Sequence, residues 1–358
     1  MSPDAGFSAV IPAGGIGSRL WPLSTPDRPK FLLDLLGTGS TLLQDTYTRV
    51  APFSDRVLVV TGAAHATEVR SQLPALGEEG LIAEPSPRDS MPAIALAAAI
   101  LEERHGPHAV GSFSADHVIG KPEAFSEAIR IARAGAESGS IVVVGIEPKG
   151  PSTGFGYIKA GAAIDGADGL FQAEAFTEKP GAEEAEAMIV AGSHFWNAGM
   201  FVARTDTLLA TLARFHPDLE KGVRELAEAW DGPGRNEAQE RIWPGLTRIA
   251  IDHAIAEPAA AEGGVAVVPA DLDWNDVGDF AVLASLVEPD SDGIRRIHRE
   301  ARVAAVDAPG SMMVGGDRPV VIVGVGDVTV VDSPEAILVL GRDAAQKVKQ
   351  AKEEMTQR

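Results

Sequence analysis

A short apolar run that leads into glycines and two basic residues constrains this chain more than any other feature. Phe7 to Ile11 is apolar, and after a proline and an alanine the stretch from Gly14 to Gly17 leaves a loop with few bulky side chains. The backbone N–H groups of such a loop can close on an anion. Arg19 and Lys30 follow and would place fixed positive charge on a phosphate chain held there. The stretch therefore predicts a strand that leads into a phosphate-binding loop.

Two better-known glycine motifs do not fit this loop. A dinucleotide-binding fingerprint requires G-x-G-x-x-G, and Leu20 stands where the third glycine belongs. A P-loop requires G-x-x-x-x-G-K-[ST], and the sequence contains no such run. The glycines alone would equally fit a tight turn without a ligand. Arg19, Lys30 and the run Trp21-Pro22-Leu23 favour the phosphate-binding interpretation.

The same stretch resembles the nucleotide-binding signature of the sugar-phosphate nucleotidyltransferases, G-G-x-G-[ST]-R-L-x-P-L-[ST] followed by P-K-x-hydrophobic. Trp21 resembles the mannose-1-phosphate guanylyltransferase branch of that family. These enzymes join a nucleoside monophosphate to a sugar phosphate, and their loop wraps the triphosphate. The resemblance implies that the nucleotide is bound here by Ala13, Gly14, Gly15, Gly17, Ser18, Arg19 and Lys30.

Composition and charge narrow the classes of partner. The 358 residues suffice for one large domain and a smaller one, and 51 acidic against 31 basic residues give a net charge of −20. A protein with this net negative charge repels nucleic acid and anionic membranes. It can bind an anionic ligand only at a local basic site. Cysteine is absent, which excludes disulfides and thiol nucleophiles. With no apparent signal peptide and no apolar run near the ~20 residues of a membrane span, we expect a cytoplasmic protein.

Strand and helix patterns alternate through the first 145 residues. Strands are predicted at 7–11, 57–61, 81–83, 109–114 and 141–145, and helices at 41–50, 64–73, 91–104 and 122–138. This alternation favours an α/β fold with a Rossmann-like, mixed and mainly parallel sheet flanked by helices, which the resemblance makes nucleotidyltransferase-like (GT-A-like). Ligands of such sheets lie beyond the carboxyl ends of the strands, and the glycine loop follows the first strand.

A proline-rich segment after the third strand resembles the family element E-P-x-x-R-N-T-A-P-A-I-A, which lies beside the nucleotide base. Here it reads Glu84-Pro85-Ser86-Pro87-Arg88-Asp89-Ser90-Met91. Its prolines predict an extended connection, and we expect Ser90 to cap the following helix. The resemblance implies base contacts from Glu84, Arg88, Asp89 and Ser90. A rigid connection with a solvated arginine is the alternative.

Two aspartates, far apart in sequence, are candidate metal ligands. Asp116 emerges after a strand in Ala115-Asp116-His117, which resembles a family A-D-H element, and Asp276 stands in Trp274-Asn275-Asp276-Val277-Gly278, which resembles W-x-D-x-G. Carboxylates near phosphates suit Mg²⁺. The alternatives are a helix or turn cap for Asp116, and a solvated loop or a helix cap for Asp276. The resemblance implies that Asp116 and Asp276 hold one Mg²⁺.

A glycine-rich and aromatic region after residue 145 has the groups that a sugar-binding site needs. These are carboxylate and amide groups for hydroxyls, glycines that permit close approach, and apolar walls. Antiparallel strands are predicted at 156–160 and 172–176, laid beside the first sheet. Its runs resemble T-G-Y-G-Y-I, F-x-E-K-P and W-N-x-G-M-F of the family. The resemblance implies that the sugar phosphate is bound by Gly145, Gly156, Glu178, Lys179 and Asn197. Core packing of the aromatics and a solvated Glu178–Lys179 pair are the alternatives.

The tail from Ile294 changes to short runs rich in Val, Gly and Asp, predicted as strands at 303–306, 320–325, 328–331 and 337–340 before a helix at 343–354. We expect a catalytic domain over residues 1–290 and a β module over 291–358. The resemblance implies a left-handed β-helix that packs on its own domain or on a partner subunit, and we expect a homodimer. A small sandwich is the alternative.

The resemblance implies a Mg²⁺-dependent enzyme that transfers GMP from GTP to mannose 1-phosphate and releases pyrophosphate. We expect a single activity and direct in-line displacement. Arg19, Lys30, Asp116 and Asp276 are its predicted catalytic residues. One alternative is a nucleotidyltransferase for another NTP and sugar phosphate. The other is a non-catalytic subunit that senses sugar nucleotides.

Overall fold

The computed structural model describes residues 6–298 and 302–356. Contacts divide the chain into two compact units, and neither is continuous in sequence. The first unit comprises residues 6–14, 46–115 and 119–274, and the second comprises 15–45, 116–118 and the chain from 275 onward. The chain therefore passes between the units several times.

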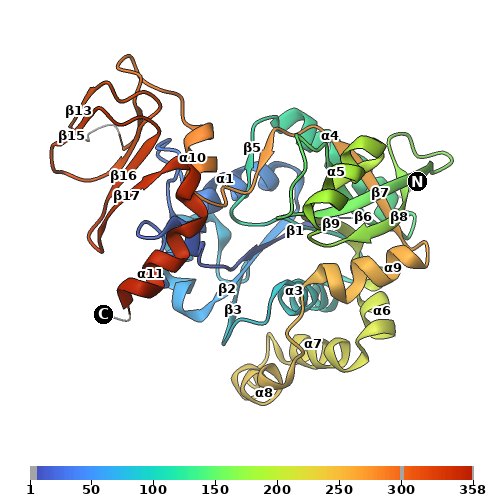
Figure 1. Ribbon diagram of the computed structural model, residues 1–358. Coiled ribbons are helices and arrows are strands. Elements are labelled where there is room, and N and C mark those ends of the chain that lie inside the picture. The colour runs from blue at the N-terminus through green and yellow to red at the C-terminus, as the bar shows by residue number, and fades with distance from the viewer. Residues whose placement is uncertain (1–5, 299–301, 357–358) are drawn as a thin grey trace. The chain divides into compact units, whose positions relative to one another are not determined.

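The first unit is built on a nine-stranded sheet with the order β3-β2-β1-β4-β9-β6-β10-β8-β7 (Figure 1). Pairs β1–β2, β2–β3, β1–β4 and β6–β10 are parallel, whereas β9 is antiparallel to both β4 and β6. Only β8 and β9 run against the other strands of this sheet. Its strands are β1 (Phe7–Ala13), β2 (Arg56–Gly62), β3 (Leu81–Glu84), β4 (Ala109–Ser112), β6 (Ile141–Ile146), β7 (Gly156–Ala163), β8 (Phe171–Thr177), β9 (His194–Arg204) and β10 (Val265–Ala270).

Helices cover both faces of this sheet. In β6, Val143 belongs to the apolar core formed with α3, α6 and α7, while the neighbouring Val142 lies against Gly135 of α4. Because successive side chains of a strand point to opposite faces, α3 and α4 lie on opposite sides. The helices that follow or cover the strands are α1 (Leu42–Val50), α2 (Ala66–Gln72), α3 (Ser90–His105), α4 (Pro122–Glu137), α5 (Ala182–Ala191), α6 (Thr205–Phe215), α7 (Pro217–Ala229), α8 (Arg235–Ile242) and α9 (Glu257–Ala261), with a π-helical turn at Asp252–Ala256.

The predicted elements of this unit are present, and most of their bounds agree within two residues. The exceptions lie among the antiparallel strands: β7 extends to Ala163, and β9 was not predicted as a strand at all. The cap expected from Ser90 is wrong, because Ser90 is the first residue of α3 and its Oγ accepts a hydrogen bond from the backbone N of Ile251 at 2.9 Å. Within residues 6–298 and 302–356, no helix has the length and apolar character that crossing a membrane requires.

The second unit combines the glycine loop with the C-terminal segments. Its core joins Leu20 and Trp21 after the loop to Phe280 of α10, Met312 of β14 and Val348 of α11. The elements of this part are α10 (Phe280–Leu286), β12 (Arg295–Ile297), β13 (Val303–Val306), β14 (Met312–Gly315), β15 (Val320–Val323), β16 (Val328–Asp332), β17 (Ile337–Gly341), a 3-10 segment at Arg342–Lys347 and α11 (Val348–Thr356). Strands β5 (Val118–Ile119) and β11 (Trp274–Asn275) form a separate two-stranded sheet.

The C-terminal strands stack with a period of 17 residues. Arg295 pairs with Met312 and Met312 with Thr329, all in parallel strands, and Val303 pairs with Val320 in a second parallel sheet. The first two coils of 17 residues thus contribute one strand to each sheet, and β16 adds a third parallel strand to the first sheet, which is the arrangement of a β-helix. The expected β-helix is confirmed, and the sandwich alternative is wrong because sandwich sheets are antiparallel.

The corners of these coils repeat the same backbone conformation. Asp307 and Gly324, 17 residues apart, have φ values of 51° and 69°. Gly310 and Asp327, also 17 apart, have φ values of 71° and 52°. Glycine, asparagine and aspartate tolerate this left-handed region best. The corner residues therefore follow from the backbone that the coil requires.

Gly324 and Gly341 offer a matched test of this requirement. A Cβ on either residue would meet nothing within 4 Å, but Gly324 has φ 69° whereas Gly341 has φ −72°. We expect Gly324→Ala to lower the free energy of unfolding by about 1 kcal/mol. Gly341→Ala should raise it by about 0.5 kcal/mol, because alanine fits that conformation and restricts the unfolded chain. Urea denaturation of the full chain measures both, and equal effects of the two substitutions would contradict the corner assignment.

Candidate active site

The glycine loop is held against the segment that carries Lys30. Gly17 has a left-handed backbone with φ 74°, and a Cβ on it would lie only 2.7 Å from the Cβ of Lys30. The hydroxyl of Ser24 donates to the carbonyl of Gly17 at 2.5 Å, and the backbone N of Lys30 donates to the carbonyl of Ile16 at 3.2 Å. Only glycine fits position 17, because both the conformation and the close approach exclude a side chain.

Lys30 connects two residues that are remote in the sequence. Its ammonium group is 2.8 Å from Oδ2 of Asp116 and donates to the backbone carbonyl of Asp276 at 2.5 Å. The residue is 7% exposed. An ammonium group has three N–H donors, so two of them are engaged here. Among the residues that the structure describes, the third donor has no such partner and could serve a ligand.

The two predicted metal-binding carboxylates have different electrostatic environments. Burial alone would raise the pKa of Asp116, but the charges of Lys30 and His117 and the hydrogen bond from Lys30 hold it below its usual value. Burial raises the pKa of Asp276, and the charges of Lys30 and Arg19 only partly offset that effect, while Asp116 adds to it. The ionised form of Asp276 is therefore less well stabilised than that of Asp116, so a further cation would stabilise it more.

A cavity of about 380 Å³ brings the predicted catalytic residues together. Gly278 is part of its wall. A Cβ on this residue would be 3.0 Å from Oδ2 of Asp276 and 3.3 Å from Nη2 of Arg19. The two charged side chains thus approach each other over a residue without a side chain. The residues that line the cavity are Gly17, Ser18, Arg19, Lys30, Asp116, His117, Asp276 and Gly278.

The remaining loop residues flank this cavity in the sequence. Ala13 is the last residue of β1, Gly14 and Gly15 are exposed, and Gly15 has φ 83°. Among the nearby acids, the helix cap considered for Asp276 is instead Asp279, whose Oδ1 accepts hydrogen bonds from the backbone N of Ala281 and Val282 at 2.8 and 3.0 Å. The nucleotide and metal roles of these residues stay predictions.

The predicted base-binding segment lies at the end of β3 in the first unit. Glu84 is half-buried, and its Oε1 is buried with no hydrogen-bond partner among the described residues. Arg88 donates to the carbonyl of Pro244 at 2.7 Å, and Asp89 accepts two hydrogen bonds from Arg248 at 3.0 and 3.2 Å. Glu84 is therefore the acceptor in this segment that is left without a donor, while the carboxylate of Asp89 already has one.

The five residues predicted for the sugar phosphate converge within the first unit. Gly145 and Gly156 both pair with Asn197 of β9, in β6 and β7 respectively. A Cβ on Gly156 would lie 2.5 Å from Oε2 of Glu178, so glycine admits that carboxylate next to Asn197. Lys179 is 2.5 Å from the other oxygen of Glu178. The structure brings these residues together, and their binding role stays a prediction.

Asp252 joins this cluster and was not among the predicted site residues. The side-chain amide N of Asn197 donates to Oδ1 of Asp252, while Oδ1 of Asn197 accepts from the backbone N of Gly199 at 2.9 Å. Burial raises the pKa of Asp252, and the charge of Glu178 adds to the shift. Asp252 begins the π-helical turn, a conformation common at functional sites. The sequence predicts packing helices in this segment, with Asp252 near the site, and the hydrogen bond from Asn197 brings Asp252 into the cluster.

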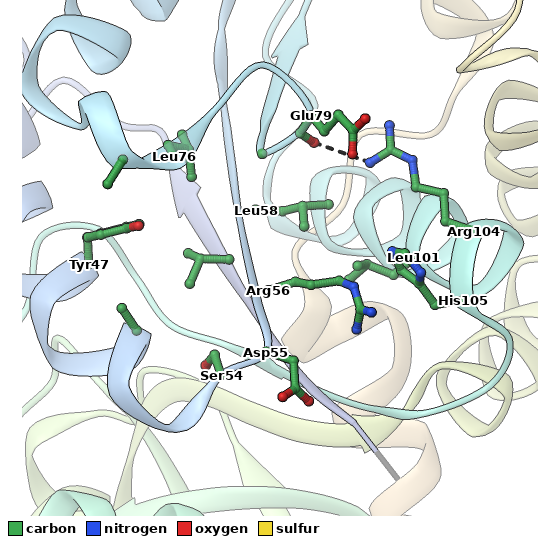
Figure 2. A pocket seen from close by; sticks show the side chains of 14 residues that line it. Tyr47, Ser54, Asp55, Arg56, Leu58, Leu76, Glu79, Leu101, Arg104 and His105 are labelled. Atoms are coloured by element: carbon green, nitrogen blue, oxygen red, sulfur yellow. Dashed lines mark hydrogen bonds between the residues drawn. The ribbon is translucent and has the colours of Figure 1, made fainter. Parts of the chain in front are cut away.

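A second cavity, of about 350 Å³, lies at the amino-terminal edge of the large sheet (Figure 2). It is lined by residues at the start of β2, such as Arg56, and at the end of α3, where Arg104 donates to the carbonyl of Glu79 at 3.2 Å. None of the predicted site residues lines it. It is also at the wrong end of the parallel strands, since ligands of such sheets bind beyond their carboxyl ends.

Comparison with known proteins identifies the family. The model of the family described as nucleotidyl transferase matches residues 8–291, and a model described as MannoseP isomerase/GMP-like beta-helix domain matches 301–355. The chain belongs to the nucleotidyl transferase family. It is an enzyme of the nucleotidyltransferase class, and the predicted fold class is confirmed.

Individual relatives of this nucleotidyltransferase agree with the family models. A mannose-1-phosphate guanylyltransferase of Klebsiella pneumoniae is 35% identical over 97% of this chain and 74% of the relative. The xanthan biosynthesis protein XanB of Xanthomonas campestris pv. campestris is 36% identical over 95% of this chain and 71% of the relative. A solved structure from Thermus thermophilus, titled mannose-1-phosphate geranyltransferase, has a TM-score of 0.86 at 30% identity and covers 98% of this chain and 99% of its own.

The buried carboxyl group of Glu84 predicts a specific pH dependence of stability. Burial raises its pKa from 4.5 to about 7, so the folded protein keeps a proton that the unfolded chain has lost between these values. The contribution of Glu84 to the free energy of unfolding is greatest below about pH 4.5 and decreases as the pH rises to 7. We expect Glu84→Gln to be more stable than the wild type at pH 8 by on the order of 2 kcal/mol, and equally stable at pH 4.5.

Urea denaturation of the full chain at both pH values measures this difference. Glu78→Gln is the matched control, because Glu78 is an exposed carboxylate of the preceding turn and its replacement should change neither value. Equal stability of Glu84→Gln and the wild type at pH 8 would show that the carboxylate is solvated.

Proposed function

We propose that this nucleotidyltransferase transfers GMP from GTP to mannose 1-phosphate and releases GDP-mannose and pyrophosphate. The observation that carries the proposal is Lys30, which joins Asp116 and Asp276 beside a cavity that Arg19 also lines. This set of charges suits phosphoryl transfer, in which positioning and charge neutralisation supply most of the catalysis. The choice of GTP and mannose 1-phosphate is supported by the name of the Klebsiella pneumoniae relative.

The residues around the cavity fit a bound Mg²⁺. Asp116 and Asp276 would supply hard oxygen ligands, and the negative charge of Asp116 contributes to the raised pKa of Asp276. No cluster of three or more His, Cys, Asp or Glu side chains suited to a metal occurs among residues 6–298 and 302–356. Mg²⁺ at phosphates needs only one or two carboxylates, because waters and phosphate oxygens complete its shell. When bound there, the ion would neutralise phosphate charge.

The chain's own residues then have defined tasks. A sugar phosphate has a second pKa of ~6, so it is largely ionised at neutral pH and needs no general base to attack. Its oxygen forms a bond to the α-phosphorus of the nucleotide while the bond to the pyrophosphate breaks, and the electron pair leaves with the pyrophosphate. Arg19 and the free donor of Lys30 stabilise the charge on that leaving group. No side chain needs to form a covalent intermediate.

The first unit supplies the recognition groups in this proposal. Glu178, Asn197 and Asp252 offer carboxylate and amide oxygens to sugar hydroxyl groups. Glu84, with an unpaired acceptor at the end of β3, offers one to the donors of a guanine base. Both sets belong to one unit, so a single sheet fixes the distance between base and sugar recognition.

Pyrophosphate release across substrate pairs tests the proposed function. GTP, ATP, UTP and dTTP are each combined with mannose 1-phosphate and with glucose 1-phosphate. We expect GTP with mannose 1-phosphate to give a kcat/KM at least about tenfold above any other pair. EDTA should stop the reaction and added Mg²⁺ should restore it. Faster turnover of another pair would overturn the substrate assignment, and activity that survives EDTA would overturn the metal assignment.

Replacement of Arg19 tests the assignment of charge stabilisation. We expect Arg19→Ala to lower kcat by at least about a hundredfold, because a fixed cation at a leaving pyrophosphate acts mainly in the transition state. Arg28→Ala is the control: Arg28 is exposed and does not line the cavity, so turnover should stay within about twofold. Circular dichroism checks that both variants are folded. A kcat for Arg19→Ala within a few-fold of the wild type would remove Arg19 from the mechanism.

A further inference from the structure

The last helical segments of the chain lie against the glycine loop within the second unit. The backbone of Ser18 and Arg19 begins a short 3-10 helix after Gly17. Leu20 and Trp21, which follow, share an apolar core with Ala345 and Val348. Ala345 and Val348 are 3% and 2% exposed. These contacts fix the start of α11 against the loop.

Gln346 connects the loop arginine to a buried carboxylate. Nη1 of Arg19 donates to Oε1 of Gln346 at 3.2 Å, and Nε2 of Gln346 donates to Oδ2 of Asp279. Asp279 is 5% exposed, and its other oxygen caps α10. The amide of Gln346 therefore has a fixed orientation. It offers the guanidinium group a neutral acceptor, so the positive charge of Arg19 is not cancelled.

Two lysines of α11 face the same loop. Lys349 and Lys352 are three residues apart and hence on one side of the helix. Together with Ser18 they line a cavity of about 310 Å³, whose wall also includes Glu353 and Thr356. Neither lysine forms an ion pair with any side chain in the described part of the chain, although the protein has a net charge of −20.

Ser18 lies on both cavities of this unit. One is the cavity with Lys30, Asp116 and Asp276, and the other is the cavity with the two lysines. A chain of phosphates held in the first cavity by the glycine loop would enter the second if it extended past Ser18. The distal phosphates would meet the two ammonium groups there.

We propose that the C-terminal helix completes the polyphosphate site. Lys349 and Lys352 bind the terminal phosphates of the nucleotide and the pyrophosphate that leaves, and Gln346 is a positioning residue for Arg19. The proposal rests on the proposed function for the identity of the substrate. Its ligand chemistry, a pyrophosphate group, is common to any nucleoside triphosphate.

Binding of inorganic pyrophosphate to the full chain tests the lysines without sugar or nucleotide. Isothermal titration calorimetry in the presence of Mg²⁺ should show a Kd about tenfold weaker for Lys349→Ala/Lys352→Ala than for the wild type. Lys347→Ala is the matched control, because this exposed lysine of the same segment does not line the cavity. Its Kd should stay within about twofold. Glu353→Gln should bind pyrophosphate about two- to threefold more tightly, since it removes a negative charge from the wall.

Steady-state kinetics separate binding from positioning. The double lysine variant should raise the KM for the nucleotide about tenfold and leave the KM for the sugar phosphate unchanged. Gln346→Ala should lower kcat about tenfold with little change in either KM, because it affects the orientation of Arg19. Thermal unfolding checks that each variant is folded.

Unchanged pyrophosphate affinity of the double lysine variant would overturn the proposal, as would an equal loss in Lys347→Ala. An unchanged kcat of Gln346→Ala would overturn the positioning role. If the nucleotide preference differs from GTP, only the proposed function fails, since the pyrophosphate contrast does not depend on the base.

Discussion

The buried ammonium group of Lys30 is the interaction on which the second unit depends most. It forms an ion pair with Asp116 and donates a hydrogen bond to the backbone carbonyl of Asp276. The backbone N of Lys30 also donates a hydrogen bond to the carbonyl of Ile16 in the glycine loop. Removal of one partner from a buried charge pair costs about 3–5 kcal/mol, because the other charge is left uncompensated. One side chain thus ties together the glycine loop and the two aspartates that are the predicted metal ligands. The close approach of Lys30 in turn explains Gly17, since any side chain there would displace it.

The distribution of charge around the loop differs from that on the rest of the molecule. Most arginines elsewhere are paired with carboxylates, as Arg104 is with Asp231 and Arg318 with Asp332. Arg19 instead contacts the neutral amide of Gln346. An ion pair with a carboxylate would reduce the capacity of a cation for an anionic ligand, and the contact with Gln346 does not. The amide fixes the position of the guanidinium and leaves its charge available.

Local patterns predicted most of the first unit, because alternating apolar runs and amphipathic stretches report strands and helices directly. The glycine loop and the candidate site residues were predicted through motifs whose residue types suit the proposed chemistry, and their roles stay predictions. Strand β9 was missed because its centre, Trp196-Asn197-Ala198-Gly199, combines aromatic, amide and glycine residues that do not alternate as a half-buried strand does. The cap at Asp279 was confused with Asp276, since two acids three residues apart are equivalent in a local pattern.

Other features could not be predicted because they depend on long-range contacts. Asp252 gains its environment from Asn197, 55 residues earlier, and Gln346 contacts Arg19 from 327 residues away. The 17-residue coil was present in the sequence as Arg295, Met312 and Thr329, but these residues share no side-chain type. These positions are equivalent in backbone conformation and not in side chain. In the sequence, the repeat is indicated only weakly, by corner residues such as Asp307 and Gly324.

The final strand of the β-helix has a consequence for how this chain can vary in length. Strand β17 turns back antiparallel to β16 instead of starting another coil, and the chain then continues into α11. A solenoid ordinarily accepts extra repeats, because each repeat contacts only its neighbours. Here one added coil would move the exit of the chain by about 4.8 Å, the spacing between adjacent strands. Insertion of a repeat would thus move the terminal helix away from Ser18. The contact between this helix and the glycine loop therefore limits the number of coils.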